Sequence, residues 1–378
     1  MKKITYKDAG VDIDLGDRCS RIMYEAARKT WDNRKGLLGD VTTRFDDFSG
    51  LRYINIGGLR DAGLSLNLDG VGTKVELAER LSTWTGDYSC HQGIAFDLLA
   101  MVCDDAVLRG AEPVLVGSIL DVNRLKVELI ENLALGMVEA AREARVAVVN
   151  GEIAELGDRI SGYGEYNYNW GAVVVWMADT GALISGQHVQ PGDAIVSFQE
   201  RGFRSNGLSL FRKIMLASYG DNWHERQFNG QNIASLALTP SHIYSAFIID
   251  LIGGCQREAM VRAWVKAMAH ITGGGIPGKL GRALKPSGFG ADITDPFEPP
   301  ALMLHGQEVG HVDDAEAYRT WNMGNGLMII TDDPETIIRR AKDRSIQAAV
   351  AGRVSDKPGI RIRSKGAFSA KTPELSFE

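Results

Sequence analysis

The chain has 378 residues, of which 44% are hydrophobic, enough for two or three domains that each bury a core. Its 42 lysines and arginines and 48 aspartates and glutamates give a net charge of -6. A general nucleic-acid-binding protein is normally basic, so we expect no nucleic-acid partner. The cysteines are far apart and include no CxxC pair, which predicts reduced thiols rather than a disulfide framework or a zinc site.

The sequence also lacks the patterns of membrane insertion and export. Its longest strongly apolar run, 170–178, is less than half of what a bilayer-spanning helix needs. The first ten residues, MKKITYKDAG, have no apolar segment after the lysines, unlike a signal peptide. We therefore expect a cytoplasmic protein without a membrane partner.

Helical and strand patterns alternate along the first half of the chain. Residues 64–68 read Leu-Ser-Leu-Asn-Leu, the alternation of a half-buried strand. The other elements expected in this half are a helix over 88–108, a strand over 113–120, a helix over 126–144 and strands over 146–149 and 171–177. Such alternation is typical of a mixed α/β layer architecture.

A fresh series of elements follows a domain boundary that we place between residues 180 and 181. Expected there are a strand over 194–198, a helix over 208–218, a polar surface loop over 221–232, an apolar helix over 242–251 and a strand over 327–330. From 356 onward large apolar residues are few, which predicts a loosely held tail. The predicted organisation is therefore an amino-terminal domain (1–180), a second domain (181–355) and a tail (356–378).

The strongest local motif is the segment 69–74, Asp-Gly-Val-Gly-Thr-Lys, which directly follows the strand expected at 64–68. Its carboxylate can hold a hard cation, its glycines let a phosphate approach the backbone, and its ammonium group can neutralise that phosphate. The alternative is a glycine turn with solvated charges. This strand end is therefore a candidate phosphate and metal site.

Further acidic residues follow other buried segments. Asp104 and Asp105 end an expected helix among apolar residues, where a carboxylate is costly to bury unless it is paired or metal-bound. Glu152 follows Gly151 after an expected strand, and α/β proteins collect ligand-binding groups at strand ends. Asp69, Asp105 and Glu152 could converge on Mg²⁺, which prefers a few carboxylates together with substrate phosphates. Alternatively, each acid makes its own cap or salt bridge.

Two glycine-containing turns in the second half can bind an anion. The segment 273–280, Gly-Gly-Gly-Ile-Pro-Gly-Lys-Leu, nearly spells a Walker A loop. However, Leu280 stands where that loop needs Ser or Thr, and Pro277 lacks an amide donor, so we expect an anion-binding turn beside His270 rather than a P-loop. The segment 204–207, Arg-Ser-Asn-Gly, precedes an expected helix whose amino end can accept an anion, or it is a simple N-cap.

Taken in order, these motifs resemble the phosphoribosylformylglycinamidine cyclo-ligase family, also called aminoimidazole ribonucleotide synthetases. The matching segments are YKDAGVDI at 6–13, DGVGTK at 69–74, GAEP at 110–113, GE at 151–152, SNG at 205–207, HITGGG at 270–275 and NMG at 322–324. The resemblance covers nearly the whole chain. The family belongs to an ATP-dependent superfamily that also includes selenophosphate synthetase and thiamine monophosphate kinase.

The resemblance implies a two-domain α/β (α+β) subunit, with a mixed sheet and helices in each domain, that pairs through its amino-terminal domain in a homodimer. It implies ATP and Mg²⁺ near that interface and the fifth step of purine biosynthesis. In that step ATP activates the formyl amide oxygen of formylglycinamidine ribonucleotide, and the amidine nitrogen then closes the imidazole ring, releasing ADP and phosphate. Phosphoryl transfer rests on positioning and charge neutralisation, which the motifs above supply.

The resemblance also implies roles for individual residues. Catalytic roles are expected of Lys7, Asp69, Lys74 and His270. ATP binding is expected of Lys7, Asp69, Gly70, Gly72, Thr73, Lys74, Asp105, Gly151 and Glu152, with Asp69, Asp105 and Glu152 as Mg²⁺ ligands. Substrate binding is expected of Arg204, Ser205, Asn206, Gly207, Thr272, Gly273, Gly274, Gly275 and Asn322. Selenophosphate synthetases have Asp where this chain has His270, so this histidine is expected to mark the cyclo-ligase branch.

The chain departs from the family pattern at several positions. It reads GEIAELG at 151–157 where the family usually reads GETAEMPG, so Ile153 replaces a hydroxyl residue. Arg204 stands where the family usually has His, and 39–50 reads GDVTTRFDDFSG in place of a glycine-rich loop. At 167–169 Asn-Tyr-Asn stands where acidic residues are common. These changes leave two alternatives: a kinase or synthetase of the same superfamily with another acceptor, or a nucleotide-binding protein without turnover.

Overall fold

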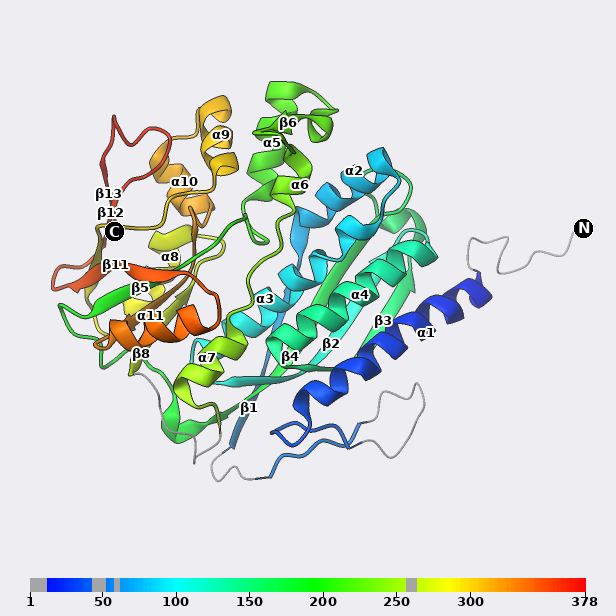
Figure 1. Cartoon of the computed structure of the whole chain (residues 1–378), viewed down its shortest axis with the longest axis horizontal. Helices are drawn as coiled ribbons and strands as arrows, with labels where there is room; N and C mark the ends of the chain where they lie inside the picture. Colours follow the sequence, from blue (N-terminus) through cyan, green and yellow to red (C-terminus); the bar gives the residue numbers. More distant parts are fainter. Residues whose placement is uncertain (1–11, 43–51, 58–61, 256–263) are drawn as a thin grey trace, which may run out of the picture.

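A computed structural model of the chain describes residues 12–42, 52–57, 62–255 and 264–378. They form two β-sheets with helices packed on them (Figure 1). Two features expected from the sequence, Lys7 and the part of the 39–50 segment from residue 43 onward, lie outside the described residues. Within the described ranges no helix is both long enough and apolar enough to cross a membrane.

The first sheet has four strands. In spatial order they are β1 (Ala62–Gly70), β4 (Tyr168–Asp179), β2 (Glu112–Val122) and β3 (Ala147–Glu155). Strand β4 is antiparallel to β1 and to β2, whereas β2 and β3 are parallel, so the sheet is mixed. The alternation at 64–68 is confirmed, because Leu64, Leu66 and Leu68 are exposed while Asn67 turns to the other face and donates to a helix carbonyl.

Helices cover one face of this sheet (Figure 1). They are α1 (Ile13–Thr30), α2 (Val75–Thr85), α3 (Ile94–Val107) and α4 (Val127–Ala144). Helix α3 is buried on nearly all sides because it packs on β1 and β4, on α4, and on α7 from the second half. Helix α1 lies along α4 and beside β3. The inner end of α3 is therefore a junction between the two halves.

The second sheet has seven strands. In spatial order they are β13 (Glu374–Phe377), β12 (Ile360–Arg363), β9 (Gly290–Ile293), β11 (Ala348–Ser355), β5 (Ala194–Gln199), β10 (Asn325–Thr331) and β8 (Val265–His270). Neighbours are antiparallel except β9 and β12, so this sheet is mixed as well. The boundary predicted between residues 180 and 181 falls between the last strand of the first sheet and the first strand of the second.

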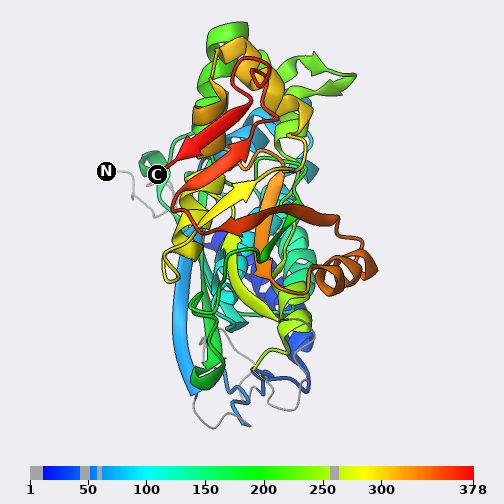
Figure 2. The ribbon, with the colours of Figure 1, turned by 90° about the vertical axis from the view of Figure 1, so that its left-hand side faces the viewer.

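The prediction of a loose tail after residue 356 is wrong. Strands β12 and β13 pair with each other, and β12 joins β9, so the end of the chain completes the second sheet (Figure 2, red). The few apolar residues there alternate along the strands, as Ile360 with Ile362 and Leu375 with Phe377, and all four are buried. Alternation over only three residues is too short to stand out in a polar segment.

The remaining elements surround the second sheet. The helices are α5 (Leu208–Tyr219), α6 (Ile233–Ala237), α7 (Ser245–Ile252), α8 (Gly275–Leu284), α9 (Ala301–Gly310), α10 (Asp314–Thr320) and α11 (Pro334–Asp343). The short 3-10 turns are η2 (Trp31–Arg34), η3 (Gly72–Lys74), η4 (Ser89–His91), η5 (Gly157–Arg159), η6 (Thr180–Ala182) and η7 (Trp223–Glu225). The predicted polar loop at 221–232 contains η7 and a short β-hairpin, in which the two-residue strands β6 (Gln227–Phe228) and β7 (Gln231–Asn232) pair.

Strand β3 is longer than expected and includes Gly151 and Glu152. The sequence predicted a strand end with a glycine turn at this point, but Gly151 is extended and pairs with Ser118 of β2. Glycine permits a turn without requiring one, and here the parallel partner strand continues the ladder past it. Glu152 is therefore a residue of an edge strand and not of a strand-end loop.

Candidate active site

The candidate site lies where the two halves meet. From the first half, Asp69 is near the end of β1, and Asp104 and Asp105 are in the last turns of α3. From the second half, His270 ends β8, and the glycine turn that follows it begins α8. The ends of strands and helices from both halves of the chain thus bring together groups that are far apart in the sequence.

Arg204 is at the centre of this junction and is fully buried. Its Nη1 donates to Glu200 Oε2 at 2.6 Å and its Nη2 to Asp104 Oδ2 at 3.0 Å, so one guanidinium pairs with a carboxylate from each half. Although burial opposes it, hydrogen bonding from His242 and the positive charge of Arg204 lower the pKa of Glu200 to about 2. The guanidinium is thus occupied inside the protein, and the expectation that it touches substrate gains no support from these contacts.

His270 links Arg204 to Asp105. Its Nε2 is 2.7 Å from Nη2 of Arg204, and its Nδ1 is 2.6 Å from Oδ1 of Asp105. Because a guanidinium can only donate, Nε2 accepts and Nδ1 carries the proton that Asp105 accepts. Burial and the charge of Arg204 lower the pKa of His270 to about 4, which keeps the ring neutral. With both ring nitrogens engaged, His270 is placed to orient Asp105 rather than to contact substrate.

Asp105 and Asp69 form an acidic pair at the open side of the junction. The Asp105 side chain is 31% exposed. Burial opposes the shift, but the hydrogen bond from His270 and the positive charges of Lys279 and Arg204 lower its pKa. The pKa of Asp69 is raised, first by partial burial and further by the charge of Asp105, while Lys279 opposes that rise. Two carboxylates that repel each other beside one ammonium group suit a divalent cation with a phosphate.

Lys74 has surroundings that the sequence did not predict. Its ammonium group is fully buried, and Nζ lies 2.7 Å from Asp97 Oδ1 and 2.7 Å from the Thr239 carbonyl oxygen. The second half of the chain covers the start of α2 at this point, so the side chain points into the protein. The expectation that Lys74 contacts the triphosphate therefore finds no support in this geometry.

The other residues of the 69–74 segment lie against the second half. Gly72 has φ +67°, and a Cβ there would lie 3.9 Å from the Ser205 carbonyl oxygen. The hydroxyls of Thr73 and Ser209 are 3.2 Å apart. Gly70 donates its amide to Asp69 Oδ1 at 2.7 Å, which orients that carboxylate at the strand end. The glycine segment and the 204–207 turn are thus brought together.

Two glycine turns of the second half also meet. Gly275 has φ +58°, and any side chain there would collide with the Tyr318 carbonyl; a side chain on Gly207, φ +75°, would collide with Trp321. The Asn206 amide oxygen lies 3.1 Å from where a Cβ of Gly273 would be. Gly273 and Gly274 are exposed. The turns at 205–207 and 273–275 therefore form one surface that a ligand can approach.

The remaining expected substrate contacts are more buried. Thr272 is buried, and Asn322 uses its side chain inside the protein, donating to the Gly202 carbonyl at 2.8 Å and accepting from the Gly324 amide at 2.9 Å. These bonds indicate a structural role for Asn322. By contrast, the Ser205 hydroxyl is buried and has no hydrogen-bond partner among the described residues, so it can still bond a ligand.

Glu152 lies apart from the acidic pair. The register runs from Asp69 through Ala172 and Ser118 to Gly151, three strand spacings or about 14 Å. No cluster of three potential metal ligands occurs among the described residues. The predicted convergence of three carboxylates on one Mg²⁺ within a subunit is therefore wrong, because β1 and β3 are opposite edges of the sheet.

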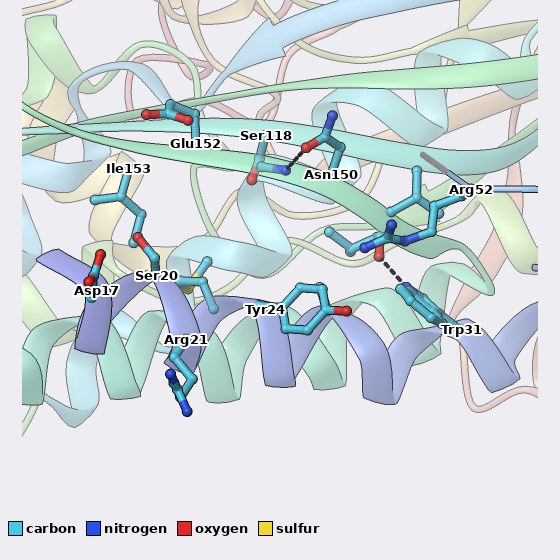
Figure 3. Close-up of a pocket in the computed structure, with 15 residues that line it drawn as sticks. Asp17, Ser20, Arg21, Tyr24, Trp31, Arg52, Ser118, Asn150, Glu152 and Ile153 are labelled. Carbon is cyan, nitrogen blue, oxygen red and sulfur yellow. Dashed lines mark hydrogen bonds between the residues drawn. The ribbon is translucent and has the colours of Figure 1, made fainter. Parts of the chain in front are cut away.

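A cavity of about 510 Å³ lies between β3 and α1 (Figure 3). It is lined by Tyr24 and Trp31 from the α1 side, by Arg52, and by the β3 backbone around Gly151. The Trp31 indole donates to the Val148 carbonyl at 2.8 Å, which fixes this wall. Its volume is that of a small-molecule pocket.

Sequence reasoning missed several residues of the junction. Glu200 is four residues before Arg204, but the segment between them is a loop, so no helical spacing signals their ion pair. His242, at the start of the apolar segment 242–251, has its Nδ1 3.2 Å from Glu200 Oε1, a contact that no sequence motif indicates. Lys279 was noted only as part of a near-Walker segment. Nothing in the sequence indicates that Asp97 pairs with Lys74.

Known proteins share this fold and these domains. Residues 55–175 match the model of the AIR synthase related protein N-terminal domain, and residues 190–365 match that of its C-terminal domain. The structure resembles hydrogenase maturation protein HypE from E. coli (TM-score 0.60, 15% identity, 95% of each chain). It also resembles thiamine-monophosphate kinase from Stenotrophomonas maltophilia (TM-score 0.56, 16% identity, 90% of this chain and 95% of that one). At these identities the structures show a shared fold alone.

Closer relatives share sequence along almost the full length. The phosphoribosylformylglycinamidine cyclo-ligase of Carboxydothermus hydrogenoformans is 34% identical over 94% of this chain and 97% of its own. That of Methanocaldococcus jannaschii is 32% identical over 93% of both chains. These matches include both sheets and the junction between them. The chain belongs to the phosphoribosylformylglycinamidine cyclo-ligase family.

Proposed function

We propose that this chain catalyses the ATP-dependent closure of formylglycinamidine ribonucleotide to aminoimidazole ribonucleotide, with release of ADP and phosphate. The observation that carries the proposal is the 34% identity to a cyclo-ligase over 97% of that relative's length. A match of this extent includes both halves and the groups at their junction. The cysteines Cys19, Cys90, Cys103 and Cys255 form no disulfide, which fits an enzyme of a reducing cytoplasm.

The junction supplies the charges that phosphoryl transfer needs. Asp69 and Asp105 fit Mg²⁺ as a two-carboxylate site, and the ion would neutralise charge on the transferred phosphoryl group. His270 and, behind it, Arg204 hold Asp105 in one orientation. The Ser205 hydroxyl and the exposed glycines 273 and 274 are free to contact the ribonucleotide.

We further propose that the chain forms a homodimer through the exposed face of the first sheet. Leu64, Leu66 and Leu68 are 60%, 53% and 70% exposed, and Ile119 on β2 is 48% exposed. A contiguous apolar face of this kind is rare on a monomer. Glu152 pairs in register with Ile119, and Figure 3 shows it on the side of β3 away from α1. Gly151 and Glu152 therefore remain candidate ATP contacts at this dimer interface.

The dimer proposal predicts that one negative charge on the exposed face of the first sheet prevents dimerisation. Leu66→Asp should convert the protein to a monomer in analytical ultracentrifugation at micromolar concentration, because a carboxylate would be buried without a partner. Leu216→Asp, at a 44% exposed leucine on α5, is the matched control and should leave the mass unchanged. A wild-type monomer under these conditions would contradict the dimer.

The activity is tested by a coupled assay of the purified protein with formylglycinamidine ribonucleotide and magnesium ATP, in which ADP and aminoimidazole ribonucleotide are followed together. Equal, substrate-dependent release of the two products supports the proposal. If ATP binds but no ring-closed product forms, the chain is a divergent member with another acceptor. Arg204, which occupies the position of the usual histidine, would then be the first residue to examine.

A further inference from the structure

A second cavity, of about 250 Å³, lies between the edge strands β1 and β8 of the two sheets. Its polar lining comes from both halves and consists of Asn67, Asp105, Arg109, His270, Lys279 and Arg282. The rest of the lining is small or apolar. The cavity includes Asp105 of the acidic pair, and of its basic residues only Lys279 belongs to a motif described above, the segment 273–280.

Positive charge dominates this cavity. Three basic side chains, Arg109, Lys279 and Arg282, face one carboxylate, Asp105. Arg109 donates to the Ile184 and Ser185 carbonyls at 3.3 and 3.2 Å, which holds it at the connection between the two sheets. In the described part of the chain neither Lys279 nor Arg282 forms an ion pair, so their charges are not neutralised.

Helix α8 explains why these cations share a wall. Lys279, Arg282 and Ala283 are spaced i, i+3 and i+4, so they lie on one face of the helix, and all three line the cavity. Ile276 and Leu280 lie on the adjoining face of the helix and are buried. The charge of Lys279 also opposes the rise in the pKa of Asp69 and contributes to the lowered pKa of Asp105 and of His270, so it acts on the whole junction.

We propose that this cavity binds a phosphate group, with Lys279 and Arg282 as its main contacts. The inference rests on the proposed function, which offers two sources: the phosphate of the ribonucleotide and the phosphoryl group that leaves ATP. Three cations against one carboxylate suit a dianionic phosphate, and guanidinium groups bind its oxygens in pairs. Lys279 thereby supplies the ammonium group that the buried Lys74 cannot.

Binding is tested first without turnover. Inorganic phosphate should raise the thermal midpoint of the full-length protein relative to chloride at equal ionic strength. The double variant Lys279→Ala/Arg282→Ala should weaken phosphate binding, measured by calorimetry, by about tenfold or more. Lys285→Ala removes an exposed lysine from the end of the same helix and should bind phosphate like the wild type. If the double variant also binds phosphate like the wild type, the proposal is overturned.

Kinetics then distinguish the two sources. If the cavity holds the ribonucleotide's phosphate, ribose 5-phosphate competes with inorganic phosphate, and the double variant has a KM for ribonucleotide about tenfold higher at unchanged KM for ATP. If it holds the transferred phosphoryl group, ribose 5-phosphate does not compete with inorganic phosphate, and the double variant has a lower kcat at an unchanged KM for ribonucleotide. If the wild type makes no aminoimidazole ribonucleotide but still binds phosphate through these residues, the proposed function fails and this site stands.

Discussion

Segments 69–74 and 273–279 both place a lysine after a glycine turn, but in opposite surroundings. Lys74 is fully buried and paired with Asp97, whereas Lys279 is partly exposed and lines a cavity beside Asp105. The first lysine holds the two halves together, and the second is free to bind an anion. The difference teaches that a glycine-lysine motif specifies a turn and a positive charge. The packing around the lysine decides whether it forms a buried ion pair or is available to a ligand.

The strongest test of this comparison is Lys74→Ala. It leaves the Asp97 carboxylate buried without its cation and should lower the free energy of unfolding by about 3–5 kcal/mol. Denaturant unfolding measures this loss, and Asp158→Asn, at an exposed carboxylate, is a control that should change little. A stable Lys74→Ala protein with a raised KM for ATP would restore the phosphate role expected from the sequence.

Asp69→Asn should affect activity rather than folding. The asparagine oxygen can still accept from the Gly70 amide, so the thermal midpoint should stay near that of the wild type. Loss of the negative charge should lower kcat/KM by about 100-fold, the usual effect of removing one electrostatic contact in a transition state. A steady-state assay at several Mg²⁺ concentrations measures it. Near wild-type turnover would show that this carboxylate is not a metal ligand.

The sequence predicts the elements better than the contacts. The alternation at 64–68 and the helical spacing over 126–144 depend only on neighbouring residues, and β1 and α4 follow them. The ion pair of Arg204 with Asp104 joins residues 100 positions apart, and that of Lys74 with Asp97 joins two helices. No local pattern encodes such pairs, because they are set by how α3 packs at the junction of the two halves.

The same limit applies to the acidic residues. Sequence order suggested that three carboxylates after buried segments could meet, and two of them do lie near each other. Glu152 does not, because strand order places β3 at the far edge of the sheet from β1. Strand order within a sheet depends on nonlocal pairing, which the spacing of motifs along the chain does not report.

The buried histidine His91, which contacts Ser82 of α2, should make the free energy of unfolding depend on pH. His91 is buried between Tyr168 and Ser82, and burial lowers its pKa to about 3. The unfolded chain then binds a proton below about pH 6.5 that the folded protein does not. His91 should therefore lower the free energy of unfolding as the pH falls below about 6.5, by up to about 1.4 kcal/mol per pH unit.

Denaturant unfolding at about pH 7 and about pH 5 measures that dependence. His91→Gln should flatten it while lowering stability at both pH values, because one of the two hydrogen bonds of the ring is lost. His188→Gln, at an exposed histidine, should keep the wild-type slope. Equal slopes in all three proteins would mean that His91 is charged in the folded state.

The smallest expected effect completes the comparison of the two lysines. Lys279→Ala removes no ion pair within the described residues and replaces lysine with a better helix former, so the free energy of unfolding should change by less than about 0.5 kcal/mol. Phosphate binding, in contrast, should weaken. If Lys279→Ala instead destabilises the protein as much as Lys74→Ala, both lysines are structural and the contrast between the two segments fails.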